Sequence, residues 1–162
     1  MAELAVVGAK KSGKITVVEG LVNYLVGKGY RVGTIKHTAH LHQFDTPGKD
    51  SYRHRQAGAR LTVAMSNEEV VMFAQPDLLD VRQLQYMTCQ QIDIWIIEDD
   101  RCADRPKVLV TRHWQQVWDM LPESVVATIG PVRLDEVPAH FEEDDYAGLG
   151  SFVTNTMLDE KR

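Results

Sequence analysis

The feature that most constrains this chain is a glycine- and lysine-rich loop close to its start. Residues Gly8 to Lys14 follow the pattern G-x4-G-K, which is typical of loops that hold the phosphates of a nucleotide. A short apolar run over residues 3–8 precedes the loop, and a segment with apolar residues at helical spacing follows it. Strand, loop and helix in this order predict an α/β fold of the P-loop kind.

The rest of the chain extends this pattern. A helix over residues 13–28, with Val17, Leu21, Val22, Leu25 and Val26 at helical spacing, is followed by a strand over 30–35. Such a βαβ unit implies a right-handed crossover and a parallel sheet. Further strands are predicted at 92–97, 107–110 and 125–129, and helices at 50–59, from Pro76 onward, and at 144–158.

Two short runs break the helix–strand alternation. Residues 61–66 and 70–74 resemble two strands joined by a tight turn, which predicts a hairpin within an otherwise parallel sheet. The predicted fold class is therefore α/β: a P-loop NTPase-like, mostly parallel sheet flanked by helices, with a β-hairpin insertion.

Length and composition limit the classes of function. The 162 residues fit one domain, so a single nucleotide-binding domain over 1–162 is expected. The formal net charge of -5 argues against general nucleic-acid binding. The start lacks the features of a signal peptide, and no run approaches the roughly 18 apolar residues of a membrane helix. Two scattered cysteines suit neither a zinc site nor a disulfide framework. We expect a cytoplasmic protein that binds no membrane.

The phosphate loop recognises charge by three devices. Its glycines let backbone N–H groups turn toward phosphate oxygens, the helix N-terminus adds partial positive charge, and Lys14 reaches the terminal phosphates. The predicted phosphate-binding residues are Gly8, Lys10, Lys11, Ser12, Gly13, Lys14, Ile15 and Thr16.

One position departs from the full signature. The residue after Lys14 is normally Ser or Thr, whose hydroxyl coordinates Mg²⁺, and here it is Ile15. Thr16 is a weak metal candidate, because one step along a helix rotates a side chain by about 100°. Nucleotide binding is expected to survive this change better than hydrolysis.

An acidic residue ends the predicted strand over 92–97. Glu98 stands where a parallel sheet presents groups to a ligand, so it is a candidate to hold Mg²⁺ through water. The alternative is a solvated acidic turn, since Asp99, Asp100 and Asp104 follow. Asp99 is also a weak candidate to replace the missing hydroxyl ligand.

The segment from His37 to Lys49 is predicted to be a long surface loop that contacts the ligand. Its candidate residues are Lys36, His37, Pro47, Gly48 and Lys49. His37, His40 and His42 invite a metal interpretation, but no regular spacing supports it. Lys49, Asp50, Arg53 and Arg55 fit either a phosphate site or an exposed helix start with an i,i+3 ion pair.

Base recognition has no motif in this chain. Thr111 and Arg112 follow a strand at the place where P-loop GTPases read the base, but the Asn-Lys-x-Asp signature is absent. Trp95, Trp114 and Trp118 are expected to pack rather than to stack on a base.

Several segments together resemble the molybdopterin-guanine dinucleotide biosynthesis protein B (MobB) family. The resemblance lies in Lys36–His40, Phe44–Ser51, Arg55–Ala59, Ile94–Glu98, Arg105–Val110 and Asp144–Leu149, and so covers nearly the whole chain. It implies a dimeric GTP-binding protein with weak GTPase activity that assists the guanylyltransferase MobA in attaching GMP to molybdopterin. The family match favours functional roles for Lys49 and Asp50, with Asp50 and Glu98 as catalytic candidates.

Three positions depart from the family pattern. Ile15 replaces Thr, Asp99 replaces Gly in the segment after Glu98, and Ala39 stands where a further His is common. Hydrolysis is therefore open, and the alternative function is a non-hydrolysing nucleotide-sensing adapter with a degenerate P-loop. A P-loop small-molecule kinase is disfavoured, because no arginine-rich lid is found.

Overall fold

The computed structural model describes residues 1–38, 44–100, 104–116 and 123–158. The chain divides into two compact units. The larger contains Met1–His37 and Gln90–Arg162, and the smaller contains Thr38–Cys89. Each unit is described by itself, and folding as one domain over 1–162 stays a prediction.

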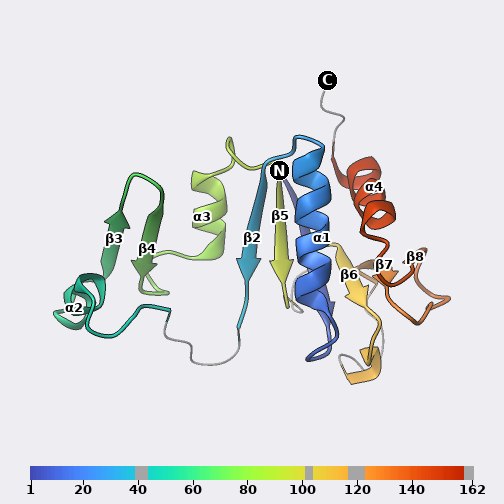
Figure 1. Cartoon of the computed structure of the whole chain (residues 1–162), viewed down its shortest axis with the longest axis horizontal. Coiled ribbons are helices and arrows are strands. Elements are labelled where there is room, and N and C mark those ends of the chain that lie inside the picture. Colours follow the sequence, from blue (N-terminus) through green and yellow to red (C-terminus); the bar gives the residue numbers. More distant parts are fainter. Residues whose placement is uncertain (39–43, 101–103, 117–122, 159–162) are drawn as a thin grey trace. The chain divides into compact units, whose positions relative to one another are not determined.

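The described part of the larger unit contains a six-stranded sheet in which every pair of neighbours is parallel. In Figure 1 the arrowheads of the labelled strands β2, β5 and β6 point to the same end of the sheet. Across the sheet, the strands are β2 (Val32–Lys36), β5 (Ile94–Glu98), β1 (Ala2–Gly8), β6 (Lys107–Val110), β7 (Val125–Ile129) and β8 (Ala139–Phe141). The predicted parallel sheet is confirmed, and β8 was missed.

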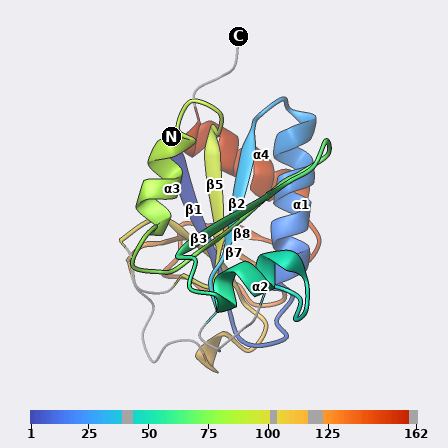
Figure 2. The same cartoon turned by 90° about the vertical axis from the view of Figure 1, so that its left-hand side faces the viewer.

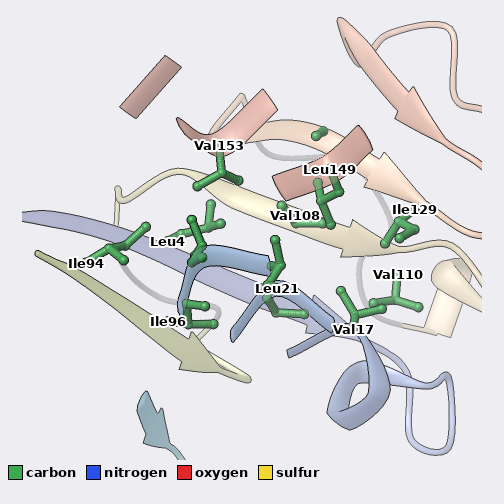
Figure 3. Packing of buried hydrophobic residues seen from close by; sticks show 13 residues of the cluster. Leu4, Val17, Leu21, Ile94, Ile96, Val108, Val110, Ile129, Leu149 and Val153 are labelled. Atoms are coloured by element: carbon green, nitrogen blue, oxygen red, sulfur yellow. The ribbon is translucent and has the colours of Figure 1, made fainter. Parts of the chain in front are cut away.

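Two helices cover one face of this sheet. Helices α1 (Lys14–Gly27) and α4 (Tyr146–Met157) pack against one core cluster that alternate strand residues such as Leu4 and Val6 supply. Figure 3 shows Leu21 of α1 and Val153 of α4 among these strand side chains. The period of two along β1 determines which face of the strand each residue occupies.

Helix α1 buries a narrow stripe. Val17, Leu21 and Leu25 are spaced by four residues and are almost fully buried. Val26, which was predicted to lie on the same stripe, is 56% exposed. Each residue turns the helix by about 100°, so Val26 leaves the face that Leu25 occupies.

The contact between α1 and α4 depends on two glycines and two tyrosines. Gly20 of α1 lies against the ring of Tyr146 of α4, and a Cβ there would overlap the ring. Gly150 of α4 lies in the same way against the ring of Tyr24 of α1. The two helices therefore approach through reciprocal contacts, each ring resting on the other helix's backbone.

The second face of the sheet has its own small core. Ala5, Val7 and Leu109 contribute to it, together with Leu134 and Val137 from the segment after β7. Val125 also belongs to this face although Ala127, two residues later, faces α1 and α4. The register of β7 against β6 shifts at this point, and a β-bulge explains the switch of face.

The smaller unit contains the predicted hairpin as a sheet of its own. Strands β3 (Leu61–Met65) and β4 (Val70–Ala74) pair only with each other in the described part of the chain. Figure 2 shows this ribbon with α2 (Asp50–Gln56) next to β3. The hairpin insertion is confirmed, but the expectation that it lies within the parallel sheet is wrong.

The helix predicted from Pro76 begins later. Helix α3 spans Val81–Met87, and Asp80 caps it by accepting a hydrogen bond from the Gln83 backbone N–H. The helical spacing of the apolar residues predicts a buried stripe of Leu78, Leu79, Val81, Leu84 and Met87. In the structure Leu78, Val81 and Met87 are exposed and Gln85 is the buried residue, so this prediction is wrong for these three. The later start, which the Asp80 cap sets, leaves Leu78 in the turn before the helix.

A short 3-10 helix, η1 (Trp114–Gln116), follows β6. Trp95 and Trp114 pack as predicted: Trp95 is 6% exposed and Trp114 lies against the second core. Trp118 lies outside the described residues. Among the helices that the structure describes, none is long and apolar enough to cross a membrane.

Candidate functional site

The phosphate loop closes tightly between β1 and α1. A Cβ on Gly8 would lie 2.6 Å from Ser12 Oγ and 3.3 Å from Lys14 Cγ, so only glycine permits this packing. Gly13 adopts a left-handed φ of 99° immediately before α1. The Ser12 N–H donates to Ala9 O at 3.2 Å and completes the turn.

Lys14 folds back beneath the loop. Its ammonium donates to Gly8 O and to Ala9 O at 2.9 Å each, and it lies 3.7 Å from Asp99 Oδ2. The Lys14 residue is only 9% exposed. In the structure as described, the ammonium thus makes two hydrogen bonds to backbone oxygens and one ion pair.

The loop also holds donors that no protein group uses in the described part of the chain. The Ser12 hydroxyl is buried and makes no hydrogen bond there. No side chain caps the first turn of α1 among the described residues. Because a helix N-terminus with uncapped N–H groups attracts anions, these groups form a site for phosphate oxygens.

The acidic residues at the end of β5 and directly after it are held by different cations. Glu98 accepts from Lys36 Nζ at 2.8 and 2.9 Å, across the register that pairs β2 with β5. Asp100 binds Arg105, which also pairs with Glu3 at 3.0 Å. Asp99 faces Lys14, as described above. The three neighbouring carboxylates therefore have three separate cationic partners.

A cavity of about 250 Å³ opens beside the loop, within the larger unit. Ser12 and Thr16 line it from the loop and α1, and Gly130 lines it from the end of β7. Arg112, which follows β6, and Glu143, which precedes α4, also line the cavity and form an ion pair. The cavity thus lies next to the phosphate loop and carries both a donor and an acceptor.

A tyrosine forms another wall of the cavity. Tyr146 donates from its hydroxyl to Asp144 Oδ1 at 2.6 Å, and both residues line the cavity. This hydrogen bond raises the pKa of Tyr146 to about 12, with smaller contributions from burial and from the charges of Asp144 and Glu143. Asp144 adopts a left-handed φ of 73°, one residue before the Asp145 cap of α4.

The predicted ligand loop divides between the two units. Lys36 and His37 belong to the larger unit, whereas Pro47, Gly48, Lys49 and Asp50 belong to the smaller one. His40 and His42 lie outside the described residues. Among the residues that the structure describes, no group of three His, Cys, Asp or Glu side chains is arranged to hold a metal ion.

The basic residues around α2 make local contacts. Lys49 occupies the N-cap position of α2, and Asp50 pairs with Arg53 at 3.7 Å, both strongly exposed. Arg55 pairs with the buried Asp45 at 3.2 Å and lies over the ring of Phe73. The i,i+3 ion pair that was left open as an alternative is therefore present.

The donor set near the loop fits Mg²⁺ only in part. Ile15 is 56% exposed and has no oxygen to offer, and Glu98 is bound to Lys36. Asp99 supplies a carboxylate beside Lys14, and Mg²⁺ is commonly held by one carboxylate together with phosphates and water. Bound there, the ion would neutralise phosphate charge. Asp99 would thus supply a metal ligand at the loop, which Ile15 cannot do.

Comparison with known proteins agrees with this geometry. The sequence model of the family described as Molybdopterin guanine dinucleotide synthesis protein B (MobB) matches residues 3–130. The chain belongs to the MobB family. The match contains the phosphate loop, both strands beside β1 and the end of β7, and the family resemblance found in the sequence is confirmed.

Two curated relatives are both named Molybdopterin-guanine dinucleotide biosynthesis adapter protein. The one from Escherichia coli (strain K12) is 29% identical over 154 residues, 90% of this chain and 87% of the relative. The one from Haemophilus influenzae is 32% identical over 139 residues, 82% of this chain and 77% of the relative. These relatives match this MobB chain over most of their length.

Solved structures of the family have the same fold. The crystal structure of Bacillus subtilis MobB aligns with a TM-score of 0.80 at 24% identity, covering 99% of this chain and 100% of that one. The MobB homologue from Bacillus stearothermophilus aligns with a TM-score of 0.69 at 23% identity, covering 96% and 97%. The predicted P-loop NTPase-like fold is confirmed.

Sequence reasoning did not find part of the cavity lining. The predicted helix over 144–158 includes Asp144 and Tyr146 and leaves Glu143 without a role, whereas all three residues line the cavity. One signal was present, since Asp145 alone suffices as the cap and leaves the preceding acidic residues for another purpose. Arg112 was placed correctly at the end of a strand, but its partner was not predictable.

The hydrogen bond between Tyr146 and Asp144 predicts a late phenol titration. The ordinary tyrosine pKa is 10.0, and in the folded chain Tyr146 should titrate with a pKa of about 12. Because the folded state holds this proton more tightly, the bond stabilises the fold below about pH 10 and is lost as pH rises through about 12.

Phenolate absorbance during alkaline titration measures this effect. Asp144→Asn should move one transition toward pH 10, and Tyr146→Phe should remove that transition and so assign it. A wild-type chain whose tyrosines all titrate near 10 would contradict the hydrogen bond.

Proposed function

We propose that this MobB chain is a GTP-binding accessory protein of molybdenum cofactor assembly. In this role it assists a molybdopterin guanylyltransferase, MobA, in the cytoplasm. The proposal is supported by family membership and by the names of the relatives, which call them adapter proteins of molybdopterin-guanine dinucleotide biosynthesis. Purified chain should bind GTP and accelerate GMP transfer to molybdopterin by MobA.

One observation carries the nucleotide part of the proposal. The buried Lys14 ammonium and the Ser12 hydroxyl both lie at the turn that ends β1 and opens α1. A buried hydroxyl without a protein partner costs free energy, and a bound phosphate would supply its partner. Nucleotide phosphates fit this site because charge-assisted hydrogen bonds from Lys14 and the loop backbone recognise them.

The adjacent cavity supports guanine as the base. Guanine presents an acceptor at O6 beside donors at N1 and N2, and the cavity offers the Arg112 guanidinium beside the Glu143 carboxylate. Adenine has an acceptor at N1, which a carboxylate would repel. We propose that this pair replaces the missing Asn-Lys-x-Asp signature in reading the base.

The remaining site residues take proposed roles from the family resemblance. Glu98 and Asp50 are the candidates for catalysis, and Glu98 with Thr16 for the metal. Lys36, His37, Pro47, Gly48 and Lys49 form the loop expected to respond to the ligand. Thr16 lines the cavity, which supports a place near the nucleotide.

A non-hydrolysing adapter is the second candidate function. It is favoured by Ile15, which provides no metal ligand, and by the Lys36–Glu98 ion pair, which neutralises the carboxylate expected to serve hydrolysis. An adapter would use nucleotide binding alone to control its partner.

We also propose that the chain forms a homodimer through its hairpin. One face of the two paired strands is wholly apolar and substantially exposed, with Met65 76% and Val70 60% exposed opposite each other. A two-stranded hairpin is marginal in water, and an edge strand can pair with its own copy about a two-fold axis. A second copy of the chain could cover the apolar face and pair with the edge strand at the same time.

Lys14 is expected to dominate nucleotide affinity. Lys14→Ala should weaken GTP binding at least about tenfold, roughly 1.4 kcal/mol, because its charge-assisted contacts do not depend on a metal. Isothermal titration measures the change. Lys28→Ala, at the exposed end of α1, is the matched control and should bind as wild type does. Equal affinity in a folded Lys14→Ala chain would remove the phosphate-loop assignment.

Ile15 is expected to limit turnover more than binding. Ile15→Thr should raise the Mg²⁺-dependent GTPase rate while GDP affinity changes little, because the new hydroxyl would place the ion against the phosphates whose charge develops during hydrolysis. Both side chains are β-branched, so the helix start should be kept. Steady-state phosphate release measures the rate. A wild-type rate already equal to that of Ile15→Thr would show that the ion is held by other groups.

The hairpin face is expected to control the oligomeric state. Met65→Lys should shift the chain toward a monomer, because a charge on an apolar interface must be desolvated there. Light scattering after size-exclusion chromatography measures the mass. Glu68→Lys, in the hairpin turn, changes the charge in the same direction without touching the apolar face and should leave the mass unchanged. A wild-type monomer at all concentrations would rule the dimer out.

A further inference from the structure

Asp99 lies directly beside the phosphate loop and is fixed there by the sheet. Its backbone N–H donates to Val6 O at 2.9 Å, which continues the pairing of β5 with β1 past the last residue of the strand. Its backbone has a left-handed φ of 66°. This turn carries the carboxylate toward Lys14, where Oδ2 lies 3.7 Å from the ammonium.

We infer that Asp99 makes the terminal-phosphate site selective for nucleotide that carries a divalent cation. The inference rests on the proposed nucleotide-binding function. Asp99 adds a fixed negative charge to the only cation that the structure describes beneath the loop, Lys14. A nucleotide without a metal would bring several more negative charges to the same place.

Electrostatics gives this arrangement its selectivity. Like charges a few ångströms apart repel strongly where water is partly excluded, and here the side chains of Lys14 and Asp99 are only 10% and 33% exposed. A divalent cation between a carboxylate and phosphate oxygens changes repulsion into attraction, because the ion is then the largest local charge. Asp99 thus opposes free nucleotide and accepts the metal complex.

The neighbouring carboxylates do not share this role. Glu98 is bound on both oxygens by Lys36, and Asp100 is bound by Arg105. Asp99 is the one of the three whose described ion pair involves the phosphate-loop lysine. Lys14 must therefore exchange its contact with Asp99 for a contact with phosphate when a nucleotide binds.

The test compares nucleotide affinity with and without Mg²⁺. Fluorescent GDP and GTP analogues are titrated into wild type, Asp99→Asn and Asp135→Asn, each in excess Mg²⁺ and in EDTA. Asparagine tolerates the left-handed conformation, so the backbone at position 99 should be kept. Asp135→Asn removes the same charge from an exposed position of the larger unit and serves as the matched control.

Wild type and Asp135→Asn are expected to bind at least about tenfold more weakly in EDTA. Asp99→Asn should lose most of this difference, because its affinity in EDTA rises about tenfold while its affinity in Mg²⁺ changes less than about threefold. Asp99→Gly, which also suits a positive φ, should behave in the same way and provides a second variant if the first does not fold.

Two results would overturn the inference. One is an equal ratio of affinities in wild type and Asp99→Asn, and the other is an Asp99→Asn chain weakened equally in both buffers, which would make Asp99 only a positioning residue for Lys14. Wild type that binds no nucleotide even in Mg²⁺ would instead overturn the proposed function, and the inference with it.

Discussion

Strand β1 lies between β5 and β6 and is hydrogen-bonded in parallel to both. Its register sets Val6 opposite Glu98 on one side and Gly8 opposite Val110 on the other. The end of β1, where the phosphate loop begins, therefore lies beside the last residue of β6 and two residues beyond the last residue of β5. This alignment brings the acidic residues after β5 and the cavity residues after β6 to the phosphate loop, although both groups lie far from that loop in the chain.

Charge at this end of the sheet is balanced internally. Lys14, Lys36 and Arg112 each pair with a carboxylate, namely Asp99, Glu98 and Glu143. The cations Lys36 and Arg112 are exposed, and ion pairs of this kind contribute little to stability. Under the proposed function, the phosphates of a nucleotide would replace these protein carboxylates as partners of the cations.

Much of the fold could be predicted from the sequence because the signals are local. The loop glycines, the apolar strands and the period of α1 each depend on neighbouring residues. Strand β8 has three residues and none of them is buried, so it carried no signal. The start of α3 was misplaced because Pro76 and Asp80 are both acceptable starts, and the cap formed with Gln83 decided between them.

The part of the candidate site that is one continuous segment could be predicted. The part that combines residues distant in the chain was missed. Gly8 to Lys14 is a single segment whose chemistry can be read directly. The cavity combines Arg112 with Glu143, which lie 31 residues apart, and the Arg112 side chain alone does not reveal which acid it meets. The hairpin was found from its alternation, but alternation does not determine whether a strand pair joins a larger sheet.

The reciprocal packing of Gly20 with Tyr146 and of Gly150 with Tyr24 restricts how α1 can move. Rotation of α1 about its axis would bring a side chain against the Tyr146 ring in place of Gly20, and sliding would part both ring–backbone contacts at once. These two contacts therefore hinder both rotation and sliding of helix α1 against α4. Any adjustment to an arriving anion is therefore expected in the five residues between β1 and α1, residues 9–13, and not in the helix that follows them.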